Sequence, residues 1–343
     1  MLPIQPDPIL SANTTKMNQV PNRSKIKWLG VVTLFFHFLL GNAAHAQIYV
    51  VHNNESTVSE YTTSGAPVNT SLITAPSGYT FGPLTSLGSN LLITESNFGS
   101  PKIAEYTTSG ATVNPSFITG AGSFEITVSG SYLYTSDDRG IGKYTLSGTA
   151  VNATLITHTF DARLALSGTA IFATQLYSGL ISEYTTSGAT VSAPLISEPT
   201  NGQYLFGVGG LAISGTNLFI ANSSNGPPDT GYISVYTLSG TLVNAALITG
   251  LPNPTGIAIS GSYLYILNSG DGTGTGSIGK YNLDGTPVNA ALVTGLNEPD
   301  FFTVISDDTP ATDTPTMSPG WLGLMALLLL MIAAKFLPKL RPT

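Results

Sequence analysis

The 343-residue chain repeats one phrase six times, and this repetition limits the possible folds more than any other feature. The two copies that agree best read YTLSGTLVNAALIT from Tyr236 and YNLDGTPVNAALVT from Tyr281. The remaining copies begin at Tyr61, Tyr106, Tyr144 and Tyr184. Successive copies are 45, 38, 40, 52 and 45 residues apart. A period near 40 residues indicates that each copy is one supersecondary unit of a repeat architecture.

Each unit reads as four short strands. In the sixth unit, residues 256–260 form an apolar segment, and residues 263–267 are rich in residues that favour strands. Residues 278–281 and 290–294 supply the third and fourth strands. Asp284-Gly285 joins these two by a tight hairpin, because glycine adopts positive φ without steric cost. Four-stranded units at this period predict a β-propeller with one blade per repeat.

The propeller is expected to close through its ends. Residues 48–52 match the second strand of the other units, so blade 1 lacks a first strand at its N-terminal side. Residues 301–306 follow the sixth unit, where another first strand is due. Pairing these two segments would remove the open strand edges of the ring. The predicted fold is therefore all-β: a six-bladed β-propeller over residues 47–306, closed by a C-terminal strand in blade 1.

The N-terminal segment, residues 1–46, has the pattern of a signal peptide. Basic residues precede an apolar core over residues 28–40, and Ala44-His45-Ala46 resembles a cleavage site. Met17 is a possible true start. The alternative is an uncleaved membrane anchor, but the apolar core is short for a span.

The C-terminal segment divides into three parts. Residues 307–320 form a Pro/Thr/Asp linker, residues 321–337 a transmembrane helix, and residues 338–343 a basic cytoplasmic tail. The alternative for the helix is a buried terminal element, for which no partner groove is evident.

Two parts of the chain resemble known families. Thr314-Pro-Thr-Met-Ser318, Trp321, the short apolar helix and the basic tail resemble the IPTL-CTERM sorting signal, which is related in layout to PEP-CTERM signals. This resemblance implies a bacterial protein that is exported and processed by signal peptidase and a C-terminal sorting protease. It would remain at the outer side of the inner membrane through its helix, or reach the cell surface or the exterior. Separately, GIAISGSYLYILN from Gly256 resembles NHL-type propellers, with Asn268 in the position of their aspartate.

Each second strand ends in a polar residue. These six residues are His52, Glu95, Asp137, Gln175, Asn222 and Asn268. Equivalent blades would place them in a ring on one face. One hypothesis is that each side chain anchors its own loop. The other is a polar site for a cation or a sugar-like ligand, with calcium held by Glu95, Asp137, Asn222 and Asn268 because calcium prefers oxygen ligands.

The loops expected on that same face vary in length and hold ten of the fifteen carboxylates in residues 47–306. Further ligand-face candidates among them are Asp138, Asp271, Glu298 and Asp300. Loop variation on one face of a repeat protein commonly marks its binding face. The acidic residues could instead serve only solubility.

Composition excludes several functions. The chain has no cysteine and four histidines, which rules out disulfides and cysteine-bound metals. Residues 47–315 hold five Lys/Arg against eighteen Asp/Glu, an excess that argues against nucleic acid and favours cations. Phosphate-loop, nucleophile-elbow and metalloprotease motifs are missing.

We therefore expect a binding or surface-interaction module with an unknown protein or carbohydrate ligand. The alternatives are a structural matrix component and a calcium-dependent hydrolase resembling gluconolactonase-like propellers, in which Asp137, Asn222 and Asn268 would match one metal-binding position.

Overall fold

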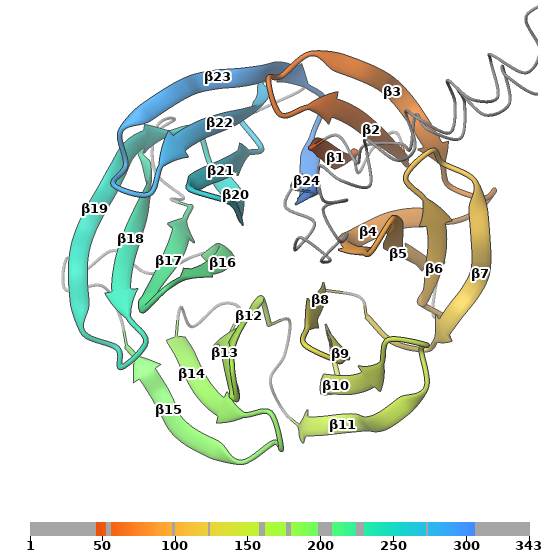
Figure 1. The fold of residues 1–343 in the computed structure, drawn as a ribbon, viewed down its shortest axis with the longest axis horizontal. Coiled ribbons are helices and arrows are strands. Elements are labelled where there is room, and N and C mark those ends of the chain that lie inside the picture. Colours follow the sequence, from red (N-terminus) through yellow and green to blue (C-terminus); the bar gives the residue numbers. More distant parts are fainter. Residues whose placement is uncertain are drawn as a thin grey trace, which may run out of the picture. The chain divides into compact units, whose positions relative to one another are not determined.

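The computed structural model describes nine stretches of the chain: residues 46–52, 56–97, 100–122, 124–157, 162–175, 180–197, 208–223, 230–271 and 274–305. Over these stretches the chain forms 24 β-strands in six four-stranded sheets, arranged as blades around a central axis (Figure 1). This confirms the six-bladed propeller. The predicted signal peptide, linker, sorting helix and basic tail lie outside the described residues. Within the described stretches, no helix is long and apolar enough to cross a membrane.

The strands of each blade are given from the axis outward. Blade 1 consists of β24 (Pro299–Ile305), β1 (Gln47–His52), β2 (Thr57–Thr62) and β3 (Pro67–Thr74). Blade 2 consists of β4 (Thr80–Leu87), β5 (Asn90–Ser96), β6 (Lys102–Thr107) and β7 (Thr112–Thr119). Blade 3 consists of β8 (Glu125–Ser129), β9 (Tyr132–Asp137), β10 (Gly140–Thr145) and β11 (Ala150–Thr157). Blade 4 consists of β12 (Leu164–Ser167), β13 (Ala170–Gln175), β14 (Leu180–Thr185) and β15 (Thr190–Ile196). Blade 5 consists of β16 (Val208–Ser214), β17 (Asn217–Asn222), β18 (Gly231–Thr237) and β19 (Leu242–Leu251). Blade 6 consists of β20 (Pro254–Ser260), β21 (Tyr263–Asn268), β22 (Gly276–Asn282) and β23 (Pro287–Leu296).

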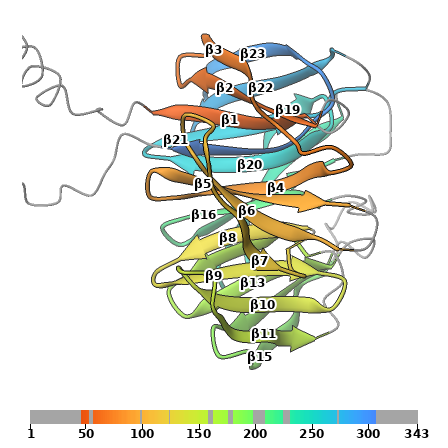
Figure 2. The ribbon, with the colours of Figure 1, turned by 90° about the vertical axis from the view of Figure 1, so that its right-hand side faces the viewer.

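The ring closes as the sequence predicts. β24 pairs antiparallel with β1, with Gln47 opposite Ile305 and Val51 opposite Phe301. Gln47 also pairs with Thr62. The carbonyl of Thr62 accepts a hydrogen bond from the amide of Gly65, which lies in the hairpin turn between β2 and β3. The propeller therefore begins and ends on the face formed by the six hairpins between third and fourth strands, which we call the turn face. The opposite face, where the second strands end, we call the variable face; Figure 2 shows the ring from the side, with the turn face on the left.

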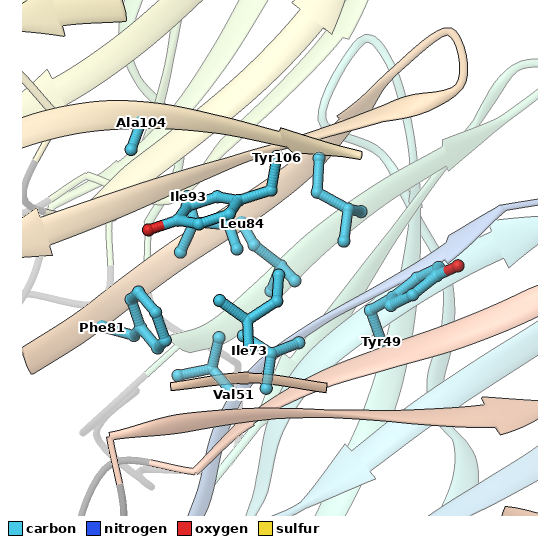
Figure 3. Packing of buried hydrophobic residues seen from close by; sticks show 10 residues of the cluster. Tyr49, Val51, Ile73, Phe81, Leu84, Ile93, Ala104 and Tyr106 are labelled. Carbon is cyan, nitrogen blue, oxygen red and sulfur yellow. The ribbon is translucent and has the colours of Figure 1, made fainter. Parts of the chain in front are cut away.

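Neighbouring blades are joined by hydrophobic clusters. The buried residues form six clusters, and each cluster combines side chains of two adjacent blades. In blade 1, Tyr49 and Val51 pack toward blade 2, whereas Ile48 and Val50 pack toward blade 6. This follows from the alternation of side chains along a strand. Figure 3 shows the cluster between blades 1 and 2, where the ring of Tyr106 lies edge-on to Phe81.

The repeated phrase forms the joint between blades. Gly285, in the hairpin turn of blade 6, has φ of +86°, and a Cβ on it would lie 2.7 Å from the carbonyl oxygen of Leu247 in blade 5. Only glycine combines this conformation with this close approach. The same contact recurs between Gly65 and Leu292, Gly110 and Leu72, Gly148 and Phe117, Gly188 and Leu155, and Gly240 and Leu195. The glycine of the phrase is thus an element of blade packing as well as of the turn.

The fourth strand of blade 6 is longer than predicted. It begins at Pro287, where pairing with Tyr281 resumes directly after the turn, and reaches Leu296. The prediction of residues 290–294 missed the start because Asn289 interrupts the apolar pattern at a bulge, where its side chain accepts a bond of 3.2 Å from the Ala291 amide. Proline is tolerated at this position because the strand is the outer edge of its sheet.

Candidate functional site

The six polar strand ends lie at equivalent positions of the six blades. His52, Asp137, Gln175, Asn222 and Asn268 are the last residues of their strands, and Glu95 is the residue before the last. Each pairs with the third strand of its own blade near its start. Five of these residues are nearly inaccessible to solvent: His52, Glu95, Asp137, Asn222 and Asn268 are 0–5 % exposed.

These buried side chains have partners close by in sequence. Glu95 forms an ion pair of 3.0 Å with Lys102 and accepts a hydrogen bond from the Tyr106 hydroxyl. Asp137 accepts bonds from the Arg139 amide at 2.9 Å and from its guanidinium Nε at 3.2 Å. The contact with Lys102 joins β5 to the start of β6, and the contact with Arg139 holds the turn between β9 and β10.

Three further members of the ring, Asn222, Asn268 and His52, also have hydrogen-bonding partners. Asn222 donates to Ser234 at 2.9 Å, and Asn268 donates to Ser277 at 3.2 Å. The two ring nitrogens of His52 lie 2.8 Å from Ser59 Oγ and 3.0 Å from the Asn297 carbonyl oxygen. This geometry supports the loop-anchoring hypothesis. Among the residues that the structure describes, no group of three or more His, Cys, Asp or Glu is placed to hold a metal ion. The calcium site stays a prediction.

The central channel is lined by the first strand of each blade, which lies nearer the axis than the second strand that carries the polar residue. A cavity of about 170 Å³ is bordered by first strands of all six blades, and none of the six strand-end residues lines it. Its ionisable lining groups are Glu125, Arg163 and Asp300, from blades 3, 4 and 1. The first strands stand between the predicted polar ring and the channel, so that ring does not converge on the opening.

A bulge places Asp300 in the channel wall. The pairing of β1 with β24 skips Asp300, because His52 is opposite Pro299 and Val51 is opposite Phe301. Thr255 and Gly209 are skipped in the same way in blades 6 and 5, and both line the channel. Bulges commonly re-aim a side chain beside a functional site. Asp300 is thus a predicted ligand-face residue that does reach the channel.

The three charged groups interact. Arg163 Nη1 lies 3.7 Å from Glu125 Oε2 and donates to the Phe124 carbonyl oxygen at 3.2 Å. Its guanidinium also lies 4.5 Å from the centre of the Phe301 ring. Burial raises the pKa of Glu125 to about 7, and the charge of Arg163 offsets only part of this effect. Burial likewise raises the pKa of Asp300, again opposed by Arg163.

Glu125 and Arg163 were missed from the sequence. Their positions could have been found by aligning the first strands, because residues 125–129 and 163–167 match residues 256–260 and end in the same serine. The acidic and basic side chains then stand where blade 6 has Gly256. Of the other acidic candidates, Asp271 donates its amide to Thr275 at 3.1 Å, and Glu298 has a left-handed backbone with φ of +43°.

A second depression lies on the variable face between blades 2 and 3. We call it the blade 2–3 groove; its volume is about 790 Å³. Its walls comprise Tyr79, Ser96, Ser100, Pro101, Lys102, Thr119, Gly120, Phe124, Asp137, Asp138 and Arg139. The volume is in the range of about 300–1,000 Å³ that is typical of ligand pockets. Asp138, a predicted ligand-face residue, is exposed on its wall.

Solved structures share the fold at low sequence identity. A chain from a nidogen/laminin complex matches with a TM-score of 0.55 and 11 % identity, covering 76 % of this chain and 98 % of that one. A protein of unknown function from Bacteroides caccae matches with a TM-score of 0.52 and 11 % identity, covering 76 % and 99 %. No protein-family model matches the chain, and no curated protein does. These likenesses show the propeller fold alone.

Proposed function

We propose that this protein is an exported propeller, sorted to the bacterial envelope by its C-terminal helix, that acts as a binding module through its variable face. The proposed partners in its maturation are signal peptidase and a sorting protease. The proposed ligand is a carbohydrate or protein component of the envelope or of the cell's surroundings.

The observation that carries this proposal is the position of the two propeller ends. Gln47 and Ile305 are paired at the turn face, so a stalk that continues beyond residue 305 starts on that side. The variable face is the face opposite this starting point. An outward-facing surface of variable loops is suited to ligand binding, as in other scaffolds that carry function on their loops.

The two faces differ in what they offer a ligand. The variable face carries the blade 2–3 groove and the charged wall of the channel. The turn face is built from repeated hairpins, each fixed against its neighbour by a glycine contact. Repeated, tightly packed turns suit a structural role, whereas differing residues at equivalent positions suit specificity.

The proposal is tested by measuring whether the protein binds to envelope material. The full chain, purified in detergent, is mixed with cell-wall sacculi and outer-membrane vesicles from the bacterium that produces it. We expect saturable binding to one of the two materials. Absence of saturable binding to both would contradict a role as an envelope-binding module.

A further inference from the structure

The blade 2–3 groove is charged, yet its cations are already neutralised. Lys102 Nζ lies 3.0 Å from Glu95 Oε2, donates to the Pro115 carbonyl oxygen at 2.8 Å, and stands 4.9 Å from the centre of the Tyr79 ring. Arg139 is bound to Asp137 through its backbone amide and its guanidinium, and also donates to the Gly120 carbonyl oxygen. The two strand-end carboxylates therefore serve to hold the two groove cations.

This pairing disfavours a strongly charged ligand. An anion that recruited Lys102 or Arg139 would leave Glu95 or Asp137 without a counter-ion, and the side chains of both carboxylates are at most 7 % exposed. Separating a buried charge from its partner is strongly unfavourable. The exposed carboxylate of Asp138 interacts with the charge of Arg139, so it offers a cationic ligand little net attraction. The groove is consequently matched to a ligand without net charge.

The rest of the wall can recognise hydroxyl groups. Ser96, Ser100 and Thr119 each offer a hydroxyl that both donates and accepts. The carboxylate of Asp138 accepts only, and the guanidinium of Arg139 donates only. Sugar hydroxyls combine both roles, so such a mixed wall can satisfy several of them at once.

Two aromatic side chains add apolar surface. Tyr79 precedes β4, and Phe124 precedes β8, so blades 2 and 3 each contribute one ring to the groove. The face of an aromatic ring is electronegative and attracts the weakly positive C–H groups on the flat side of a sugar. Aromatic rings with neighbouring hydrogen-bonding groups are the combination that binding of a neutral sugar requires.

We propose that the blade 2–3 groove binds a short, neutral oligosaccharide. This inference rests on the proposed function and specifies the ligand class of its binding face. Tyr79 and Phe124 would pack on the sugar rings, and Asp138 with the groove hydroxyls would bind the sugar hydroxyls. The ion pairs of Lys102 and Arg139 would hold the wall in place.

The test uses the full chain in a detergent without a sugar headgroup, titrated calorimetrically with trisaccharides. The neutral probes are α-1,4-glucan, β-1,4-glucan and N-acetylglucosamine trisaccharides; a sulfated and a uronic-acid trisaccharide are the charged probes. We expect at least one neutral probe to bind and the charged probes to bind about tenfold more weakly. Tyr79→Ala and Asp138→Asn should each weaken the neutral probe by about tenfold.

Matched controls exist on the turn face. Lys280 Nζ lies 4.0 Å from the centre of the Tyr263 ring, in the way that Lys102 Nζ lies over the Tyr79 ring. Asp284 is an exposed carboxylate in a hairpin turn. Tyr263→Ala and Asp284→Asn should leave the titration unchanged. Preference for a charged probe, failure of every neutral probe, or equal loss in groove and control variants would overturn the inference. If envelope material still binds while every trisaccharide fails, the sugar proposal is wrong and the binding-module proposal stands.

Discussion

Gly65 of blade 1 is packed against the Leu292 carbonyl of blade 6, and a Cβ on Gly65 would lie 2.1 Å from that oxygen. The equivalent glycine contact also connects the five remaining pairs of neighbouring blades. Two features therefore join the first and last parts of the propeller: the contact of Gly65 with Leu292, and the pairing of β24 with β1.

The glycine contact between blades predicts that replacing Gly65 by alanine lowers stability more than replacing Gly88, although both glycines have positive φ. Gly65 has φ of +89°, and Gly88 has φ of +59° with open space around it. Gly88→Ala should cost about 1 kcal/mol of unfolding free energy, from backbone strain alone. Gly65→Ala should cost at least about 2 kcal/mol more, because blades 6 and 1 must separate. Urea unfolding measures both, and equal losses would show that the joint is not a tight contact.

Closure by β24 predicts the effect of truncation. A chain that ends at Ile305 should keep the melting temperature of the propeller, because no described strand is removed. A chain that ends at Gly295 loses β24 and should melt at least about 10 °C lower, since blade 1 then lacks its inner strand. Calorimetry on both chains provides the comparison. Equal melting temperatures would mean that β24 contributes nothing to stability.

The channel predicts a dependence of stability on pH. Glu125 has a folded-state pKa near 7, above its unfolded value of 4.5, so the folded state binds the proton more tightly. Its stabilising contribution is complete below pH 4.5 and is lost as the pH rises through 7. Glu125→Gln should therefore reduce the fall in melting temperature between pH 5 and pH 8. Glu105→Gln, in the third strand of blade 2, is the control, and an equal reduction in both variants would exclude Glu125 as the source.

Calcium distinguishes the two hypotheses for the polar ring. Because Glu95 and Asp137 already pair with Lys102 and Arg139, loop anchoring predicts that millimolar calcium leaves the melting temperature unchanged. It also predicts that Glu95→Gln lowers the melting temperature without calcium, because Lys102 loses its counter-ion. A calcium-dependent rise that disappears in the Glu95→Gln, Asp137→Asn double variant would instead establish the metal site.

The sequence predicted the fold better than the site. The period of the repeat, the hairpin glycines and the missing first strand were sufficient to derive six blades and their closure, because each feature is local or repeats at a fixed distance. The six polar strand ends were also identified correctly as equivalent positions. Their distance from the axis was not evident, because sequence does not show that the first strands separate them from the channel.

The charged channel wall depends on contacts between blades. Arg163 of blade 4 meets Glu125 of blade 3 and Phe301 of blade 1, which are far apart in the chain. The bulge that places Asp300 in the wall is visible only in the strand register. The blade 2–3 groove likewise arises from loops of two repeats, and its charge balance depends on the pairing of Lys102 with Glu95. Such features cannot be read from any single repeat.

The most direct test of the account asks which face binds. The chain has no cysteine, so one introduced cysteine gives a unique attachment point. Ser100→Cys lies in the groove on the variable face, and Ser109→Cys lies in the hairpin of the same blade on the turn face. Each variant is modified with a polyethylene glycol maleimide and mixed with the envelope material that the unmodified protein binds. We predict that the polymer at residue 100 abolishes attachment and that the polymer at residue 109 leaves it intact; the reverse pattern, or equal inhibition at both positions, would contradict binding through the variable face.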